Sequence, residues 1–91
     1  MNFLTTSTFE KTLKKLHKNE QAEVKKAVAD LTYFFESGKR SDGLGLKCLR
    51  KPIWEIRASI RTRILFSFVE NDITFLIIGS HDEVKSFLKK L

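Results

Sequence analysis

The spacing of apolar residues changes near Gly38, and this change constrains the fold more than any other feature of the chain. Before Gly38, apolar residues recur every three or four positions, which is typical of helices that bury one face. After it, they alternate with polar residues, as in Trp54-Glu55-Ile56-Arg57, which is typical of half-buried strands. The pattern predicts an α+β fold in which an N-terminal helical hairpin packs on one face of a small antiparallel β-sheet.

The N-terminal half predicts a short edge strand at Asn2–Thr5 and then two helices with a break near Lys18–Asn19. Ser7 and Glu10 have the spacing of a capping box at the start of the first helix. Asn19 is expected to cap the second helix, and Gly38 to end it. The expected apolar stripes are Phe9, Leu13 and Leu16 on the first helix, and Val24, Ala27, Val28, Leu31, Phe34 and Phe35 on the second.

The C-terminal half predicts strands joined by tight turns, and then a short C-terminal helix. The run Ile73–Ile78 is apolar on both faces, so we expect a central strand that is covered above and below. Ser80 and Glu83 have the spacing of a second capping box. The expected helix carries Val84, Phe87, Leu88 and Leu91 on one face, where packing in the core is favoured over a binding interface.

A single domain spanning residues 1–91 is expected from the length. One cysteine excludes an internal disulfide, and the scattered cysteine and two histidines argue against a structural zinc site. The start of the chain does not resemble a signal peptide, and no apolar run is long enough to cross a membrane. We therefore expect a cytoplasmic protein with no metal, no other cofactor and no membrane partner.

The positive charge is concentrated in one segment. Eight Lys and Arg residues but only two acidic residues lie between Lys39 and Arg63, and this excess equals the net charge of +6 for the whole chain. A polarised positive surface attracts polyanions, of which nucleic acid is the commonest. Five of the eight cations are arginines, which suit phosphate contacts, although a solvated basic hairpin is the simpler alternative.

Strand alternation assigns the polar side chains after Pro52 to one face of the sheet. If Trp54 and Ile56 face the helices, then Glu55, Arg57 and Arg63 point to the opposite face. Two helices cover only one side of a small sheet, so we expect this second face to be open and concave. His81 follows the central strand and opens the last helix, where backbone amides favour anions and a histidine can exchange a proton near neutral pH.

These side chains supply the groups that RNA cleavage without a metal ion requires. The reaction needs a base for the 2′-hydroxyl proton, cations for the charge that develops at phosphorus, and an acid for the departing 5′-oxygen. We expect Arg57 and Arg63 to hold the phosphate and His81 to act as acid or base. Its partner is Glu55 or a lysine of the segment Lys47–Lys51. The simpler alternatives are a Glu55–Arg57 pair across the sheet and an uninvolved surface histidine.

The chain resembles the toxins of bacterial type II toxin–antitoxin systems in the RelE/ParE superfamily. The resemblance covers essentially the whole chain and keeps the order of its elements. No single motif is diagnostic, but the series taken together is fairly specific. The matching segments are Phe9–Leu16, Gly45–Leu49, Ile53–Arg57, Arg63–Phe66 and Gly79–Val84.

The resemblance implies a ribosome-dependent endoribonuclease that cuts mRNA, arrests translation and is held inactive by a cognate antitoxin. It implies catalytic residues at Lys47, Glu55, Arg57, Arg63 and His81. The remaining cations of the basic segment are then expected to contact RNA, namely Lys39, Arg40, Arg50, Lys51 and Arg61.

The chain departs from the family pattern in two places. Many active members carry a tyrosine near the C-terminal end, but the single tyrosine here is Tyr33, in the expected second helix. Asp82 follows His81, where some relatives have an aromatic residue that stacks on a base. These departures bear on the cutting rate and base preference more than on the fold.

Two other functions remain open at this point. A non-enzymatic poison of DNA gyrase with the same fold would stay toxic after the change His81→Ala. A non-toxic nucleic-acid-binding module would bind RNA in a salt-sensitive way without affecting growth. For the endoribonuclease, the expected antitoxin is a short acidic chain that covers the cationic face or displaces the C-terminal helix.

Overall fold

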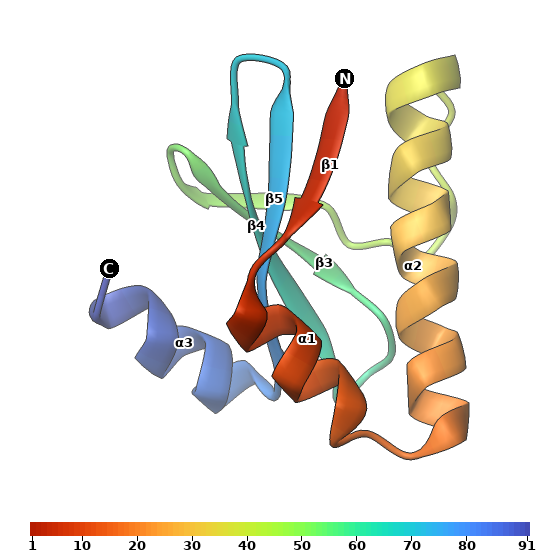
Figure 1. Ribbon diagram of the computed structural model, residues 1–91. Coiled ribbons are helices and arrows are strands. Elements are labelled where there is room, and N and C mark those ends of the chain that lie inside the picture. Colours follow the sequence, from red (N-terminus) through yellow and green to blue (C-terminus); the bar gives the residue numbers. More distant parts are fainter.

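The computed structural model describes all residues, Met1–Leu91, and contains five strands and three helices (Figure 1). The order of elements agrees with the prediction. None of the helices is long and apolar enough to span a membrane. The elements are β1 (Asn2–Thr5), α1 (Ser7–Lys14), α2 (Lys18–Ser37), β2 (Lys47–Arg50), β3 (Ile53–Arg57), β4 (Arg63–Val69), β5 (Asp72–Gly79) and α3 (His81–Lys89).

The five strands form one sheet in the order β1-β5-β4-β3-β2. Strands β2 to β5 pair antiparallel, whereas β1 runs parallel to β5, with Asn2 opposite Asp72. The sheet is therefore mixed, and the prediction of a purely antiparallel sheet is wrong. The alternation of side chains within a strand determines which of them share a face. It does not determine whether the neighbouring strand runs parallel or antiparallel. Strand β5 was predicted to be the central strand; it lies inside the sheet between β1 and β4, and β4 is the central strand.

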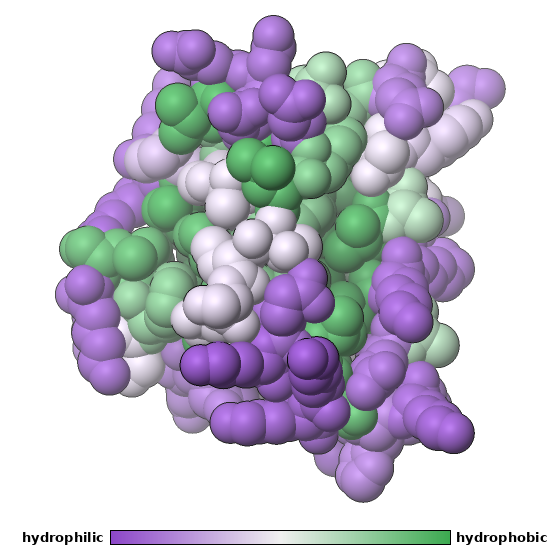
Figure 2. Space-filling view, in the orientation of Figure 1, coloured by the Kyte–Doolittle hydropathy of each residue, from purple (hydrophilic) through white to green (hydrophobic).

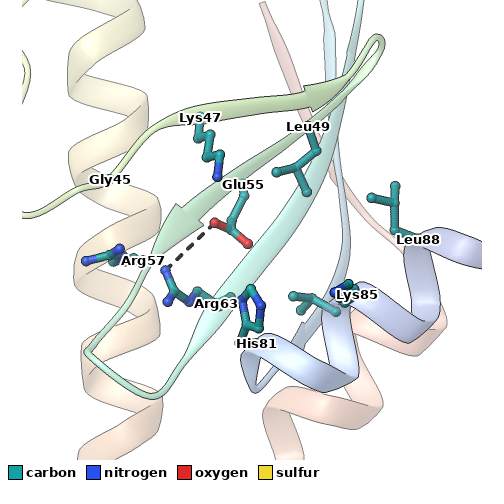
Figure 3. Close-up of a pocket in the computed structure, with 10 residues that line it drawn as sticks. Gly45, Lys47, Leu49, Glu55, Arg57, Arg63, His81, Lys85 and Leu88 are labelled. Atoms are coloured by element: carbon teal, nitrogen blue, oxygen red, sulfur yellow. Dashed lines mark ion pairs between the residues drawn. The ribbon is translucent and has the colours of Figure 1, made fainter.

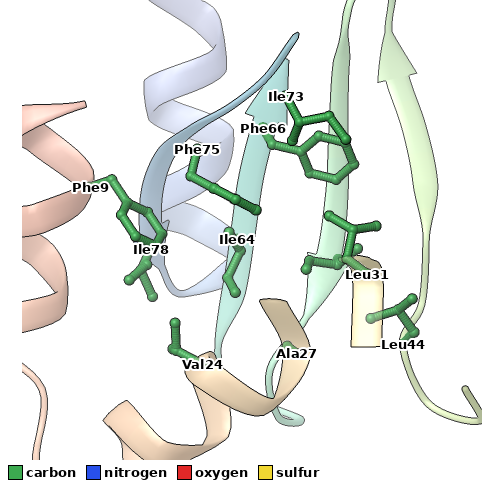
Figure 4. Close-up of a cluster of buried hydrophobic side chains, with 11 residues drawn as sticks. Phe9, Val24, Ala27, Leu31, Leu44, Ile64, Phe66, Ile73, Phe75 and Ile78 are labelled. Atoms are coloured by element: carbon green, nitrogen blue, oxygen red, sulfur yellow. The ribbon is translucent and has the colours of Figure 1, made fainter. Parts of the chain in front are cut away.

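Helices α1 and α2 cover one face of the sheet and form the main core with it (Figure 4). Their buried residues Phe9, Val24 and Leu31 pack with Ile64 and Phe66 of β4, both of which have no exposed surface. The outer sides of the two helices are hydrophilic, and some apolar side chains remain visible between β1 and α2 (Figure 2). The predicted stripes are thus confirmed as core-facing except at Phe34, which is half-buried and packs against Phe35 outside this cluster.

Helix α3 covers part of the opposite face of the sheet. Its buried Val84 packs with Ile53 and Leu65, and the half-buried Phe87 and Leu88 adjoin the same cluster. The expectation of a fully open second face is therefore wrong, because apolar residues of β3 and β4 also point there and need cover. Phe87 and Leu88 contribute to this second cluster as expected, whereas Leu91 is 56% exposed.

Two of the predicted helix starts are wrong. Thr6 rather than Ser7 caps α1, and its hydroxyl accepts from the Phe9 N–H at 3.1 Å. The same hydroxyl lies 3.1 Å from the Phe75 carbonyl oxygen of β5, to which it donates, so a contact with the sheet selects the cap. His17 rather than Asn19 precedes α2, and its N–H donates to Glu20 Oε1 at 3.3 Å.

The other predicted helix ends are confirmed. Gly38 ends α2 in the left-handed conformation, with φ of 76°, and its N–H donates to the Phe34 carbonyl oxygen. Ser80 and Glu83 form the capping box of α3, with Ser80 N–H donating to Glu83 Oε1 at 2.8 Å. This second box fixes the position at which His81 enters the helix.

Candidate active site

The register of the sheet gathers the predicted catalytic side chains. Lys47 of β2 pairs with Glu55 of β3, and Arg57 of β3 pairs with Arg63 of β4. Arg63 in turn pairs with Gly79, the last residue of β5, and His81 lies two residues further along. Lys47 and Glu55 thus lie side by side on β2 and β3. Arg57 and Arg63 lie side by side on β3 and β4, two residues further along β3.

These residues line one cavity of about 360 Å³ between the sheet and α3 (Figure 3). The structure brings all five predicted catalytic residues together in it. We call it the basic cavity, because four of its lining residues are Lys or Arg and one is acidic. Its lining residues are Gly45, Lys47, Leu49, Glu55, Arg57, Arg63, His81, Val84, Lys85 and Leu88.

Glu55 and Arg63 form an ion pair at the floor of the basic cavity. Glu55 Oε2 lies 3.8 Å from Arg63 Nη1, and the two side chains are only 9% and 16% exposed. At this distance the pair is an electrostatic contact rather than a hydrogen bond. Arg63 Nε is also buried and has no hydrogen-bond partner. A buried donor without a protein acceptor is typical of a site completed by a ligand or by ordered water.

Arg57 and Arg63 lie directly opposite each other on adjacent strands. Such a like-charge pair is unfavourable by a few tenths of a kcal/mol to about 1 kcal/mol, so an anion between the two guanidinium groups would relieve it. Gly45 supports this arrangement. Its φ is +62°, and a Cβ atom there would lie 3.1 Å from Arg57 Cγ and Cδ. A larger residue at this position would thus require the Arg57 side chain to shift by a few tenths of an ångström.

His81 is the first residue of α3 and is exposed at the rim of the basic cavity. Ser80 and Glu83 form the capping box immediately around it. The hydrogen bond from Ser80 N–H, followed by that with the Ser80 side chain, lowers the pKa of Glu83 below its ordinary value of 4.5. Glu83 is therefore ionised near neutral pH and holds the start of α3, and with it His81, against the end of β5.

None of the predicted RNA-contacting residues lines the basic cavity. The Arg50 guanidinium donates to the carbonyl oxygens of Leu88 at 3.1 Å and Leu91 at 3.3 Å, so it ties the β2–β3 hairpin to the end of α3. Arg40 lies over the Phe34 ring, 5.6 Å from its centroid. Lys39, Lys51 and Arg61 are exposed, and Arg61 lines a separate cavity of about 350 Å³.

Neither a known family model nor a curated protein matches the sequence, but several solved structures share its fold. A metal-bound toxin from Helicobacter pylori is 23% identical, with a TM-score of 0.74 over 92% of this chain and 98% of that chain. RelE of a RelB–RelE antitoxin–toxin complex from Methanococcus jannaschii is 17% identical, with a TM-score of 0.68 over 92% and 96%. The chain has the RelE toxin fold.

Other RelE-fold structures agree with this result. YafQ from Escherichia coli is 10% identical, with a TM-score of 0.68 over 91% of this chain and 96% of that chain. The resemblance seen in the sequence is thus confirmed at the level of the fold. Although one of these toxins is metal-bound, no group of three or more His, Cys, Asp and Glu side chains in this RelE-fold chain is placed to hold a metal ion.

Several residues that line the basic cavity of this RelE fold were not predicted from the sequence. Lys85 was not singled out, although it follows His81 by four positions and helical spacing puts the two on one side of α3. Leu49 and Leu88 were also missed as cavity residues. Ile53 lies two residues from Glu55 in β3, and Leu65 lies two residues from Arg63 in β4, so alternation puts all four side chains on one face. The two apolar side chains on this face were the available signal that a helix covers it.

Proposed function

We propose that the chain is the toxin of a type II toxin–antitoxin system and acts in the cytoplasm as a ribosome-dependent endoribonuclease that cuts mRNA. The observation that carries the proposal is the basic cavity, where Glu55, His81 and two opposed arginines surround one space. The RelE fold of the chain supports the same function. An antitoxin partner is supported by the RelB–RelE complex among the similar structures.

The proposed chemistry is an attack of the ribose 2′-oxygen on the neighbouring phosphorus. Glu55 accepts the proton of the 2′-hydroxyl, since it is the one carboxylate in the basic cavity. The P–O5′ bond breaks, and the departing 5′-oxygen takes a proton from His81. Arg57 and Arg63 stabilise the added negative charge on the phosphorus oxygens. The products are a 2′,3′-cyclic phosphate and a 5′-hydroxyl end.

Lys47 completes the charge around the proposed reaction. It pairs with Glu55 across β2 and β3 and lines the same cavity. An ammonium group here attracts the negatively charged phosphate. We therefore assign Lys47 to phosphate binding, and we assign proton transfer to Glu55 and His81.

Expression in a bacterial host tests the proposal, with protein and DNA synthesis followed separately. The wild type and the surface control Lys89→Ala should stop protein synthesis first, whereas Arg63→Ala and His81→Ala should not. A fall in DNA synthesis that comes first and persists in His81→Ala would instead support a gyrase poison. Salt-sensitive RNA binding with no effect on growth would support a non-toxic binding module.

A further inference from the structure

The basic cavity extends beyond the groups that the proposed cleavage uses. Those groups come from β2, β3, β4 and the first residue of α3. The other side of the cavity is formed by Leu49 of β2 and by Val84, Lys85 and Leu88 of α3 (Figure 3). These residues lie next to the proposed reaction centre and contribute nothing to its acid–base chemistry.

Lys85 is a free cation at this end of the cavity. It is exposed and takes part in no ion pair. It follows His81 by four residues, which places the two on one side of α3 and about 6 Å apart along the helix axis. Lys85 therefore lies one helical turn from the proposed reaction centre.

An apolar wall lies beside Lys85. Val84 is 2% exposed, and Leu49 and Leu88 are half-buried against the same cluster. These side chains belong to the apolar cluster between α3 and the sheet. Among the side chains at this end, only the Lys85 ammonium can donate a hydrogen bond.

We propose that this end of the basic cavity is a nucleotide subsite, in which Lys85 binds the phosphate next to the cleaved one. Leu49 and Leu88 contact the base of the same nucleotide. The subsite rests on the proposed RNA substrate. Because aliphatic side chains cannot read the hydrogen-bonding edges of a base, the subsite accepts all four bases with little discrimination.

The test is binding of the purified full-length protein to a single-stranded RNA whose 2′-hydroxyls are methylated and which cannot be cut. Lys85→Gln should weaken binding several-fold at low salt and reduce the slope of log affinity against log salt by about 0.7, the value for one phosphate contact on a single strand. Lys85→Arg should retain both properties. Lys89→Gln, on the exposed surface of α3, should match the wild type.

A second series of the same RNA carries one neutral methylphosphonate at each position in turn. A methylphosphonate at one position, next to the cut mapped on unmodified mRNA, should weaken RNA binding by the wild type. The same RNA should bind Lys85→Gln no more weakly than the unsubstituted RNA does. Equal sensitivity of both proteins at every position, or an unchanged salt slope, would overturn the subsite. The wild type could cut no mRNA while a methylphosphonate at one position still weakens RNA binding by the wild type and not by Lys85→Gln. In that case the catalytic proposal fails and the subsite stands.

Discussion

At the scale of single residues, Glu55 is the group whose role is most sharply defined by its surroundings. It is the one carboxylate in the basic cavity, and its side chain is only 9% exposed. We predict that Glu55→Gln lowers the rate of mRNA cleavage by on the order of 10²–10⁴-fold, the contribution typical of general base catalysis. RNA affinity should be retained or increase, because a negative charge leaves the cavity. Single-turnover cleavage and RNA binding measure the two effects, and a parallel loss of both would contradict the role as base.

Gly45 gives a second prediction at this scale, with Gly43 as its matched control. Both have positive φ, so alanine at either position should lower the free energy of unfolding by about 1–2 kcal/mol. Only a Cβ at Gly45 meets Arg57, at 3.1 Å, whereas nothing lies within 4 Å at Gly43. Gly45→Ala should therefore reduce cleavage beyond its effect on stability, and Gly43→Ala should not. Denaturant unfolding and cleavage rates check this, and equal rates in the two variants would refute it.

At the scale of elements, the position of α3 depends on Arg50. Its guanidinium donates to the carbonyl oxygens of Leu88, in the last turn of α3, and of Leu91, just beyond the helix. We predict that Arg50→Ala speeds hydrogen exchange in the last turns of α3 and costs about 1 kcal/mol of stability. The exposed neighbour Lys51 offers the control Lys51→Ala, which should leave exchange unchanged. Unaltered exchange in Arg50→Ala would argue that packing alone holds α3.

The contribution of the α3 cap to the stability of the fold should depend on pH. The hydrogen bonds from Ser80 lower the pKa of Glu83, so its carboxylate stabilises the fold above the ordinary value of 4.5. This contribution is lost as the pH falls through the lowered pKa of the folded state. The difference in Tm between the wild type and Glu83→Gln should therefore be largest at neutral pH and shrink on acidification below 4.5. A difference that is independent of pH would contradict this account of the cap.

The elements also show what the sequence could and could not predict. The helical and strand periods are local, so the element order and the shared face of Glu55, Arg57 and Arg63 followed from alternation. The direction of β1 and the start of α1 did not follow, because Thr6 is fixed by β5, about 70 residues away in the chain. The position of α3 on the sheet likewise depends on packing between segments that are distant in the sequence.

At the scale of the whole molecule, the fold separates structural packing from chemistry. The main core lies between the sheet and the helices α1 and α2, and the basic cavity lies on the other face beside α3. Five residues predicted from the sequence meet there because strand pairing aligns Lys47 with Glu55 and Arg57 with Arg63. The residues expected to contact RNA lie outside the basic cavity. The number of charges in a segment does not specify where in the fold each charged side chain lies.

The central claim is that the basic cavity cuts RNA through the 2′-hydroxyl, and the end groups of the cut test it most directly. Purified protein, ribosomes and a defined mRNA are incubated, and the fragments are mapped. We predict 5′-hydroxyl ends and 2′,3′-cyclic phosphates with the wild type, and loss of these fragments with Glu55→Gln and His81→Ala. Intact mRNA, fragments with 5′-phosphate ends, or wild-type cutting by both variants would contradict the account.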